Sequence, residues 1–362
     1  MSKVSTSKNK GERPGSMVIA SAGLCCSLGY HLDAAVCAMR SNMDHFRESG
    51  FFSLTSDPIK AASLPDDLFG QDRLQLWIEY AVRDCARHWP EPLSLLDPGR
   101  TALIVLAPES GRPHASQTDY ADMTRAALGT LRVQLLSSGD DKGQEVTVIA
   151  QGRSGLTAAL LQAARCLESA EAAQVLVIGI DSYLNAADIN DYLIQERLLG
   201  SGNSNGFVPG EAAAALLLRP AFGEAAGLHV KGAAVADEAG RQDGSVPSRA
   251  QGLTKAVRSA CEQAGVPPAA LSFRLGDQNG EQFYAREAAD AFTRVMFGEH
   301  KLTLLTLADK IGEVGAATGP AMLAWMWREM AHPTLSPGDV GVVHLANDDG
   351  QRSAVVLQYN GE

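Results

Sequence analysis

Acidic side chains gather in two loop segments of the second half of the chain. Asp277 and Glu281 are four positions apart, and Glu313 follows in a Gly-rich segment. Carboxylates that a fold brings together raise one another's pKa or bind a cation, so these three residues could form a metal or hydrolytic site. The alternative is that they cap helices beginning near Glu281 and Gly315, because acidic residues are favoured at helix N-termini. We prefer the second interpretation and expect no metal or cofactor.

The cysteines and histidines show no metal-ligand spacing, and no Cys-x-x-Cys pair occurs. Most cysteines lie inside apolar patterns, where a free Cys behaves as a small buried hydrophobe. His344 lies in an expected strand near the end of the chain, and a buried, hydrogen-bonded role is favoured over a catalytic one. The six cysteines are Cys25, Cys26, Cys37, Cys85, Cys166 and Cys261.

A loop rich in glycine precedes an apolar segment at residues 206–218. Gly206 and Gly210 permit turn geometries that other residues resist, and Pro209 makes the loop rigid. Glu211 then enters an almost wholly apolar stretch, where an unpartnered carboxylate is costly. We therefore expect a structural loop in which Glu211 is held by backbone N–H groups.

Composition and charge limit the classes of partner. The 362 residues are 45% hydrophobic and 20% charged, which is normal for a globular protein with a large core. The net charge of -11 argues against nucleic acid or an anionic membrane as the main partner. No apolar run is long enough to cross a bilayer, and no secretory signal is recognisable. A cytoplasmic location is expected.

Buried apolar strands alternate with amphipathic helices along the whole chain, which indicates crossover connections and a parallel sheet. We expect a disordered tail at 1–16, an N-terminal half at 17–222 and a C-terminal half at 223–362. The two halves have the same element order, which suggests an internal duplication. The strand at 212–218 is expected at a sheet edge. Other expected strands are 17–25, 101–107, 145–150, 174–180, 228–236, 271–275, 302–307, 340–345 and 353–358, with helices at 32–40, 72–89, 117–128, 155–168, 248–264, 281–296 and 316–330.

Three segments in this order resemble the beta-ketoacyl synthases of the thiolase superfamily. They are MVIASAGLCCSLG at 17–29, GFVPGEAAAALLL at 206–218 and KIGEVGAATG at 310–319. The second is the most specific, since the family has a Gly-Phe-x-x-Gly-Glu signature followed by a small-residue strand. The resemblance implies an α/β thiolase fold. Such a fold has two duplicated βαβαβαββ halves in α-β-α-β-α layers.

The resemblance also implies that the family's condensation chemistry is missing. Condensation needs a Cys thiolate to hold the acyl group, and His or Asn donors to stabilise the developing carbanion. The family's pattern places Gly152 at the Cys position, Asp277 nearest to the first His, and Glu313 at the second donor. An ionised carboxylate would repel the enolate that the donor should stabilise. The family's Gly-Phe-Gly-Gly loop is replaced by residues 346–350.

Neighbouring residues offer weaker candidates. Ser154 could serve as a nucleophile only with a general base within reach, and the converging loops hold no histidine, so a helix N-cap is the simpler role. Arg153 could bind an anion or a carboxylate, or form an ion pair at a subunit interface. Arg153, Phe207 and Asn279 are candidate substrate-binding residues.

Three functions remain open. The first is a non-catalytic adaptor, chaperone or partner subunit, forming a homodimer or heterodimer through residues 146–161, as in the family. Its partner would be a polyketide or fatty-acid synthase, an acyl-carrier protein, or a protein client such as a type VI secretion effector, because similar inactive proteins occur beside such effectors. The second is an acyltransferase with an altered active site. The third is an acyl-thioester binding protein that uses a vestigial pocket.

Overall fold

Ten strands form one continuous sheet in the computed structural model, which describes residues 17–65, 68–136, 144–221 and 226–361. Its order is β5-β4-β6-β7-β1-β8-β12-β11-β9-β10. The first five strands are β1 (Met17–Cys26), β4 (Thr101–Ala107), β5 (Val146–Ala150), β6 (Gln174–Ser182) and β7 (Glu211–Pro220). The second five are β8 (Gly227–Asp237), β9 (Phe273–Gly276), β10 (Thr303–Thr306), β11 (Val340–Ala346) and β12 (Gln351–Asn360).

The two sets of five strands have the same arrangement, which confirms the duplicated halves. Counted outward from the centre, β1-β7-β6-β4-β5 matches β8-β12-β11-β9-β10 strand for strand. The outer three strands of each set are parallel, and the inner ones are antiparallel. A short antiparallel pairing of residues 17–19 with 228–230 joins the sets.

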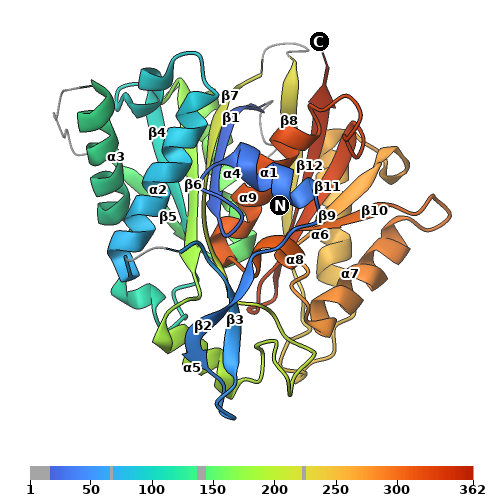
Figure 1. Ribbon diagram of the computed structural model, residues 1–362. Helices are drawn as coiled ribbons and strands as arrows, with labels where there is room; N and C mark the ends of the chain where they lie inside the picture. Colours follow the sequence, from blue (N-terminus) through green and yellow to red (C-terminus); the bar gives the residue numbers. More distant parts are fainter. Residues whose placement is uncertain (1–16, 66–67, 137–143, 222–225, 362) are drawn as a thin grey trace, which may run out of the picture.

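Helices form three layers around the two sets of strands (Figure 1). Helices α4 and α9 lie between the sets, and share one hydrophobic cluster with strands of both. Helices α2 and α3 cover the outer face of the first set, and α6 and α7 that of the second, each with its own cluster. This is the expected α-β-α-β-α layering. The helices are α1 (Leu32–Arg40), α2 (Gly70–Arg87), α3 (Tyr120–Leu136), α4 (Gly155–Glu168), α5 (Ala186–Ile194), α6 (Gln251–Ala264), α7 (Gln282–Val295), α8 (Ala308–Ile311) and α9 (Thr318–Glu329).

The composition of α9 explains its central place. All its residues except Trp327 and Arg328 are buried, and a helix that is apolar on nearly every side must lie inside the protein. Gly179 in β6 lets α9 approach the sheet, because a Cβ there would lie 2.7 Å from Pro320 and 3.1 Å from the carbonyl of Ala316. This contact fixes the beginning of α9 over the end of β6.

Most expected elements are confirmed, and three helices or strands match at both ends: 32–40, 101–107 and 155–168. The expectation of an edge position for 212–218 is wrong. That segment belongs to β7, which lies between β1 and β6, while β5 and β10 form the edges. The hairpin β2 (Phe46–Phe52) and β3 (Pro58–Ala62), and helix α5, were not anticipated. The tail at 1–16 and the boundary at 222/223 lie outside the described residues.

The expectation that no segment crosses a membrane can be compared with the helices. Within the described parts of the chain, no helix combines the length and the apolar character that a bilayer span requires.

Candidate functional site

Four loops meet at one end of the two strand sets. They follow β5, β9 and β11, or precede α9, and two of them end with a short 3-10 helix, at Gly152–Ser154 and Gly315–Ala317. The meeting is a consequence of the parallel strands, whose carboxyl ends all point to the same edge of a sheet. The loops bring together Arg153, Asp277, Asn279, Glu281, Glu313 and Asp348.

Arg153 lies at the centre of this cluster and is only 3% exposed. Its Nη1 donates to Glu313 at 3.0 Å, and its Nη2 donates to Asp348 at 3.4 Å. Asp277 lies 3.7 Å from Nε. Burial alone would lower the pKa of Arg153, but Glu313 and Asp277 hold it well above its ordinary value. The guanidinium is therefore a fixed cation whose ligands are carboxylates of the same chain.

Arg197 is a second buried cation beside the first. It forms a two-pronged ion pair with Glu281, through Nε at 2.8 Å and Nη2 at 2.9 Å. Its Nη1 donates to Asp348 at 2.5 Å. Asn279 joins the two cation sites, since its amide donates to Glu281 at 3.0 Å and to Glu313 at 2.9 Å. A planar guanidinium group can donate two parallel hydrogen bonds to one carboxylate. Such charged hydrogen bonds are stronger than hydrogen bonds between neutral groups.

The pKa values of Asp277 and Asp348 are shifted in opposite directions because the surroundings of the two carboxyl groups differ. Burial raises the pKa of Asp277 to about 6, and Arg153 only partly opposes this. Asp277 also accepts a hydrogen bond from the backbone N–H of Ala346 at 2.7 Å. Asp348 is partly exposed, and although burial acts to raise its pKa, Arg197 and Arg153 hold it at about 2. Asp348 is thus the firmly ionised member of the cluster.

Glu109 fills the space above Gly152. Gly152 has a φ of +56°, in the left-handed region, and a Cβ built on it would overlap the carboxylate of Glu109. Glu109 Oε2 is buried, has no hydrogen-bond partner among the described residues, and lies 3.9 Å from Arg112. Burial raises the pKa of Glu109, while Arg112 opposes the shift. The head of the loop after β5 is therefore occupied by an acid from another loop.

Arg112 supports this region from the side of β6. It pairs with Asp181 through Nη1 at 2.9 Å and Nη2 at 2.5 Å, and with Asp188 at 3.2 Å. Asp181 also accepts from the backbone N–H of Ala316 at 2.8 Å, which anchors the start of α9. The guanidinium lies 4.0 Å over the ring of Tyr183.

No protein-family model matches the sequence, and comparison with curated proteins gives no match either. Solved structures do match over almost the whole chain. The polyketide acyl-carrier protein complex "AntDE:AntF", with its ketosynthase, matches with a TM-score of 0.72 and 13% identity, over 96% of this chain and 100% of that one. This chain has the thiolase-like fold of the ketosynthases.

Two further structures with the ketosynthase fold are similar. One is the ketosynthase ApeO in complex with its chain length factor ApeC from Xenorhabdus doucetiae, with a TM-score of 0.66, 13% identity, and coverage of 95% of this chain and 98% of that one. The other is the ishigamide ketosynthase/chain length factor, with a TM-score of 0.68, 15% identity, and coverage of 96% and 100%. At these identities the likeness concerns the fold.

Within the ketosynthase fold, the predicted caps are mostly replaced by side-chain contacts. Ser154 occupies the N-cap position of α4 but makes no side-chain cap; its hydroxyl donates to Gln351. Glu281 precedes α7 without capping it, because Arg197 holds its carboxylate. Glu313 does accept from the backbone N–H of Gly315 at 3.0 Å. The cap prediction is therefore wrong for Ser154 and Glu281, and for Asp277, whose carboxylate accepts from Ala346 in β11; it holds for Glu313.

The glycines of the GFVPGE loop serve close packing rather than the turn geometry expected for them. Gly206 and Gly210 lie outside the left-handed region; both are glycine because a Cβ would lie 2.6 Å from the carbonyl oxygens of Arg197 and Ile311, respectively. Glu211 is held by side chains. Its carboxylate accepts from Arg73 Nε at 3.0 Å and from Ser182 Oγ at 3.2 Å.

Phe207 is 1% exposed and belongs to an aromatic cluster. Its ring lies 5.5 Å from that of Tyr183 and 5.1 Å from that of Tyr192, centre to centre. The Arg197 guanidinium lies 5.8 Å from the Phe207 ring. Phe207 therefore packs behind the ion-pair cluster, while Arg153 and Asn279 lie within it. Their expected contact with a substrate stays a prediction.

His344 is buried as expected, but the expected hydrogen bond is missing. Its Nε2 has no partner among the described residues, and its ring lies 5.0 Å from that of Phe292. Burial, with a smaller contribution from Arg274, lowers the pKa of His344 to about 3. Cys25 and Cys26 are buried in β1, where burial raises the pKa of both thiols. Neither stands at the head of α4.

The acidic residues face guanidinium groups instead of a shared cation site. In the described part of the chain, no group of three or more His, Cys, Asp or Glu side chains is arranged to hold a metal ion. Arg197, Asp348, Tyr284 and Glu109 are the members of the site that sequence reasoning missed. Asp348 accepts a hydrogen bond from the Tyr284 hydroxyl, and the Tyr284 ring lies 4.8 Å from the Arg153 guanidinium.

Proposed function

We propose that this protein is a non-catalytic, cytoplasmic subunit with a ketosynthase fold, which binds a second thiolase-fold chain. The observation that carries the proposal is the overlap between Glu109 and any side chain at position 152. The family resemblance expects the acyl-bearing thiol at that position, and here the space belongs to a carboxylate. A thioester formed at this point would need Glu109 to move away.

The donor side of the site also supports a non-catalytic role. Condensation requires neutral or cationic donors aimed at a developing negative charge. Glu313 stands at the expected donor position, and both of its oxygens are engaged, one with Gly315 and one with Arg153 and Asn279. A buried ion pair whose carboxylate is engaged through both oxygens is suited to holding loops together rather than to receiving a substrate.

The exposed edge strand β5 is an argument that a second chain binds to this protein. It is an edge strand with the sequence VTVIA, lacking the charges and prolines that usually protect an edge from pairing. Thr147 and Val148 are exposed, and Val148 is 39% exposed. Structures similar to this chain include a ketosynthase in complex with its chain length factor and a ketosynthase/chain length factor. We infer that β5 and the following residues, to position 161, form the subunit interface.

The interface is tested by co-purification with ketosynthases encoded in the same genome. We expect one of them to co-purify with this chain and Val148→Glu to abolish the complex. Val235→Glu is the matched control, since Val235 is 45% exposed on β8, far from β5 in the sheet. Complexes that tolerate Val148→Glu as well as Val235→Glu would contradict the interface. Recovery of a secretion effector or an acyl-carrier protein alone would favour an adaptor instead.

Catalysis is tested separately with acyl-CoA and acyl-carrier protein donors. A non-catalytic subunit should show no acyl adduct by intact-mass measurement, with or without its partner chain. A stable adduct on this chain would support an acyltransferase with an altered site. A rise in melting temperature with acyl-CoA and no adduct would support an acyl-thioester binding protein, because a ligand that binds the native state stabilises it.

A further inference from the structure

A pocket lies between one face of α1 and the C-terminal end of α9, away from the carboxylate cluster. Its volume is about 320 Å³, at the lower end of the range of about 300–1,000 Å³ typical of small-ligand sites. Glu313 precedes α9 and this pocket lies beyond its end, so the 12-residue helix separates the two by about 18 Å. The lining includes Arg40, Arg328, His332 and Cys37.

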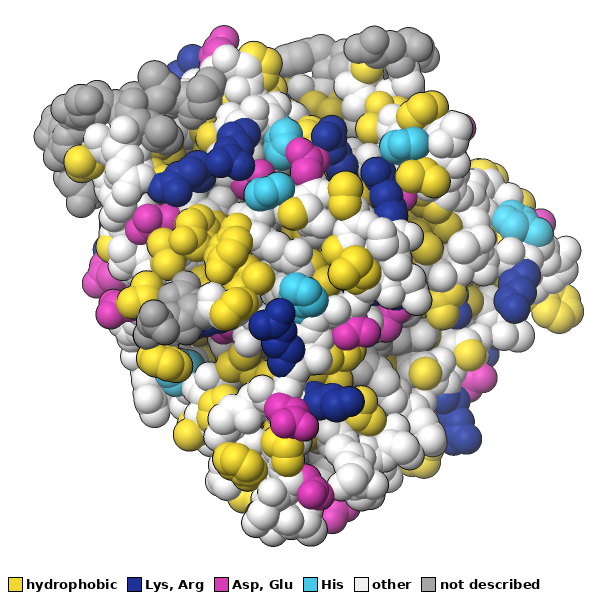
Figure 2. All heavy atoms as spheres, viewed as in Figure 1, with side chains coloured by type: hydrophobic (Ala, Val, Ile, Leu, Met, Phe, Trp, Pro, Cys, Tyr) yellow, Lys and Arg dark blue, Asp and Glu magenta, His cyan; other side chains and the backbone are white. Residues whose placement is uncertain are grey.

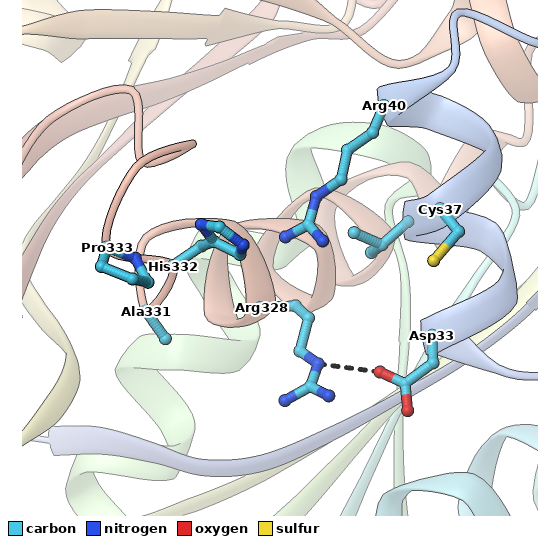
Figure 3. A pocket seen from close by; sticks show the side chains of 8 residues that line it. Asp33, Cys37, Arg40, Arg328, Ala331, His332 and Pro333 are labelled. Carbon is cyan, nitrogen blue, oxygen red and sulfur yellow. Dashed lines mark hydrogen bonds and ion pairs between the residues drawn. The ribbon is translucent and has the colours of Figure 1, made fainter.

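Three side chains of this pocket are held in place and still have N–H groups without a partner among the described residues (Figure 3). Two of them are arginines. Arg40 is bound by Glu329 through its Nε, at 3.1 Å, and Arg328 by Asp33 through its Nε, at 2.8 Å. The terminal nitrogens of both guanidinium groups have no partner among the described residues. Glu329 and Asp33 thus orient the two arginines through Nε and leave the terminal Nη1 and Nη2 atoms available to a ligand.

His332 supplies the third donor. Its Nδ1 accepts hydrogen bonds from the backbone N–H groups of Thr334 and Leu335, each at 3.2 Å. A ring nitrogen that accepts carries no proton, so the neutral imidazole must carry its proton on Nε2. No described residue accepts from Nε2, and Figure 3 shows the ring beside the space between the two arginines.

We propose that this pocket binds a phosphate group, either free phosphate or a small phosphate monoester. Open guanidinium forks fit the oxygens of phosphate in pairs, and the imidazole adds a further donor. Figure 2 shows Lys, Arg and His side chains near α1, with Asp and Glu side chains between them, on a chain whose net charge is -11. The C-terminal end of α9, with its partial negative charge, borders the pocket, so an anionic ligand depends on the arginines.

The pocket contains its own reporter. All six cysteines are described, and Cys37 alone is exposed. Alkylation by the neutral reagent iodoacetamide therefore reports access to the pocket, and Cys37→Ser verifies the labelled position. We expect inorganic phosphate at about twice its Kd to slow alkylation about threefold, at ionic strength matched with sodium chloride, since the rate falls by a factor of one plus the ratio of ligand concentration to Kd when bound ligand blocks access.

Variants of the pocket and other anions test whether phosphate bound by the arginines causes the protection of Cys37. Protection should disappear in Arg328→Gln and weaken in His332→Asn, which keeps an acceptor for the turn but lacks the Nε2 donor. Arg125→Gln, which removes an exposed, paired arginine of α3, should keep full protection. Phosphoserine and inorganic phosphate are compared, and the stronger protection identifies the monoester or the free ion. Absence of protection, equal protection by acetate, or unchanged protection in Arg328→Gln would overturn the proposal.

Discussion

The carboxylate of Glu109 lies where the side chain of residue 152 would begin, and only glycine at position 152 allows it to stay there. Two requirements meet at this residue. The left-handed backbone of Gly152 disfavours any residue with a Cβ, and the overlap with Glu109 excludes that Cβ sterically. The backbone at position 152 and the carboxylate of Glu109 therefore both require glycine at this position.

Replacing Gly152 should be costly. We expect Gly152→Ala to lower the free energy of unfolding by about 2–5 kcal/mol, from the left-handed backbone and from overpacking. Adding Glu109→Ala should recover the overpacking part and leave about 1–2 kcal/mol. Urea unfolding measures both. Gly111→Ala, in the same loop as Glu109 with nothing near its Cβ, is the control and should change stability by less than about 0.5 kcal/mol. Equal effects at 152 and 111 would contradict the overlap.

Removing the central cation should destabilise the protein strongly. Arg153→Met leaves Glu313 and Asp277 buried without their cation, and breaking such a pair costs about 3–5 kcal/mol. Chemical denaturation gives the loss directly. Arg125→Met is the comparison, because its pair with Asp122 is exposed and should be worth at most about 1 kcal/mol. A mild effect of Arg153→Met would show that the cluster contributes little to folding.

A charge at position 279 should make stability depend on pH. Asn279→Asp places a third carboxylate against Glu281 and Glu313, which must raise at least one folded-state pKa. The added destabilisation should then be small at acidic pH and grow as the pH rises through that raised pKa. Melting temperatures at pH 5.5 and pH 8 test this. Asn190→Asp, exposed on α5, should show no such trend.

His344 should account for part of the protein's acid sensitivity. Its folded-state pKa of about 3 lies below the ordinary 6.5, so the unfolded chain binds a proton more readily and stability falls as the pH drops below 6.5. Between pH 7.5 and pH 5 this one group should remove about 2 kcal/mol. His344→Gln should flatten the pH profile by that amount in urea unfolding. An unchanged profile would mean that His344 is hydrated or already charged.

The fold was largely readable from sequence, because most of the sheet is built from short, wholly apolar runs between turn residues. Segment 101–107 is such a run, and its limits were found correctly. The hairpin of β2 and β3 was missed since β2 reads FRESGFF, and its exposed, mixed pattern resembles a loop. The position of β7 was missed because an apolar strand can occupy the middle or the edge of a sheet with the same sequence.

Only some residues of the candidate site could be predicted from the sequence. The residues at 152, 153, 277, 279, 281 and 313 do meet, as expected from the loops that carry them. Their partners were not found, because Arg197 lies 84 positions from Glu281 and 151 from Asp348. No local pattern links such distant residues. An arginine before the GFVPGE loop and an acid in a terminal turn become informative only when the strand order is known.

The ion-pair cluster divides its charges between the two duplicated halves. Both guanidinium groups, Arg153 and Arg197, come from the first half, and the four acids Asp277, Glu281, Glu313 and Asp348 come from the second. Two copies of one half would bring like charges face to face, which disfavours that assembly. If the chain were produced as two separate fragments, each would recognise the other in preference to itself, and their recombination would weaken as salt concentration increases.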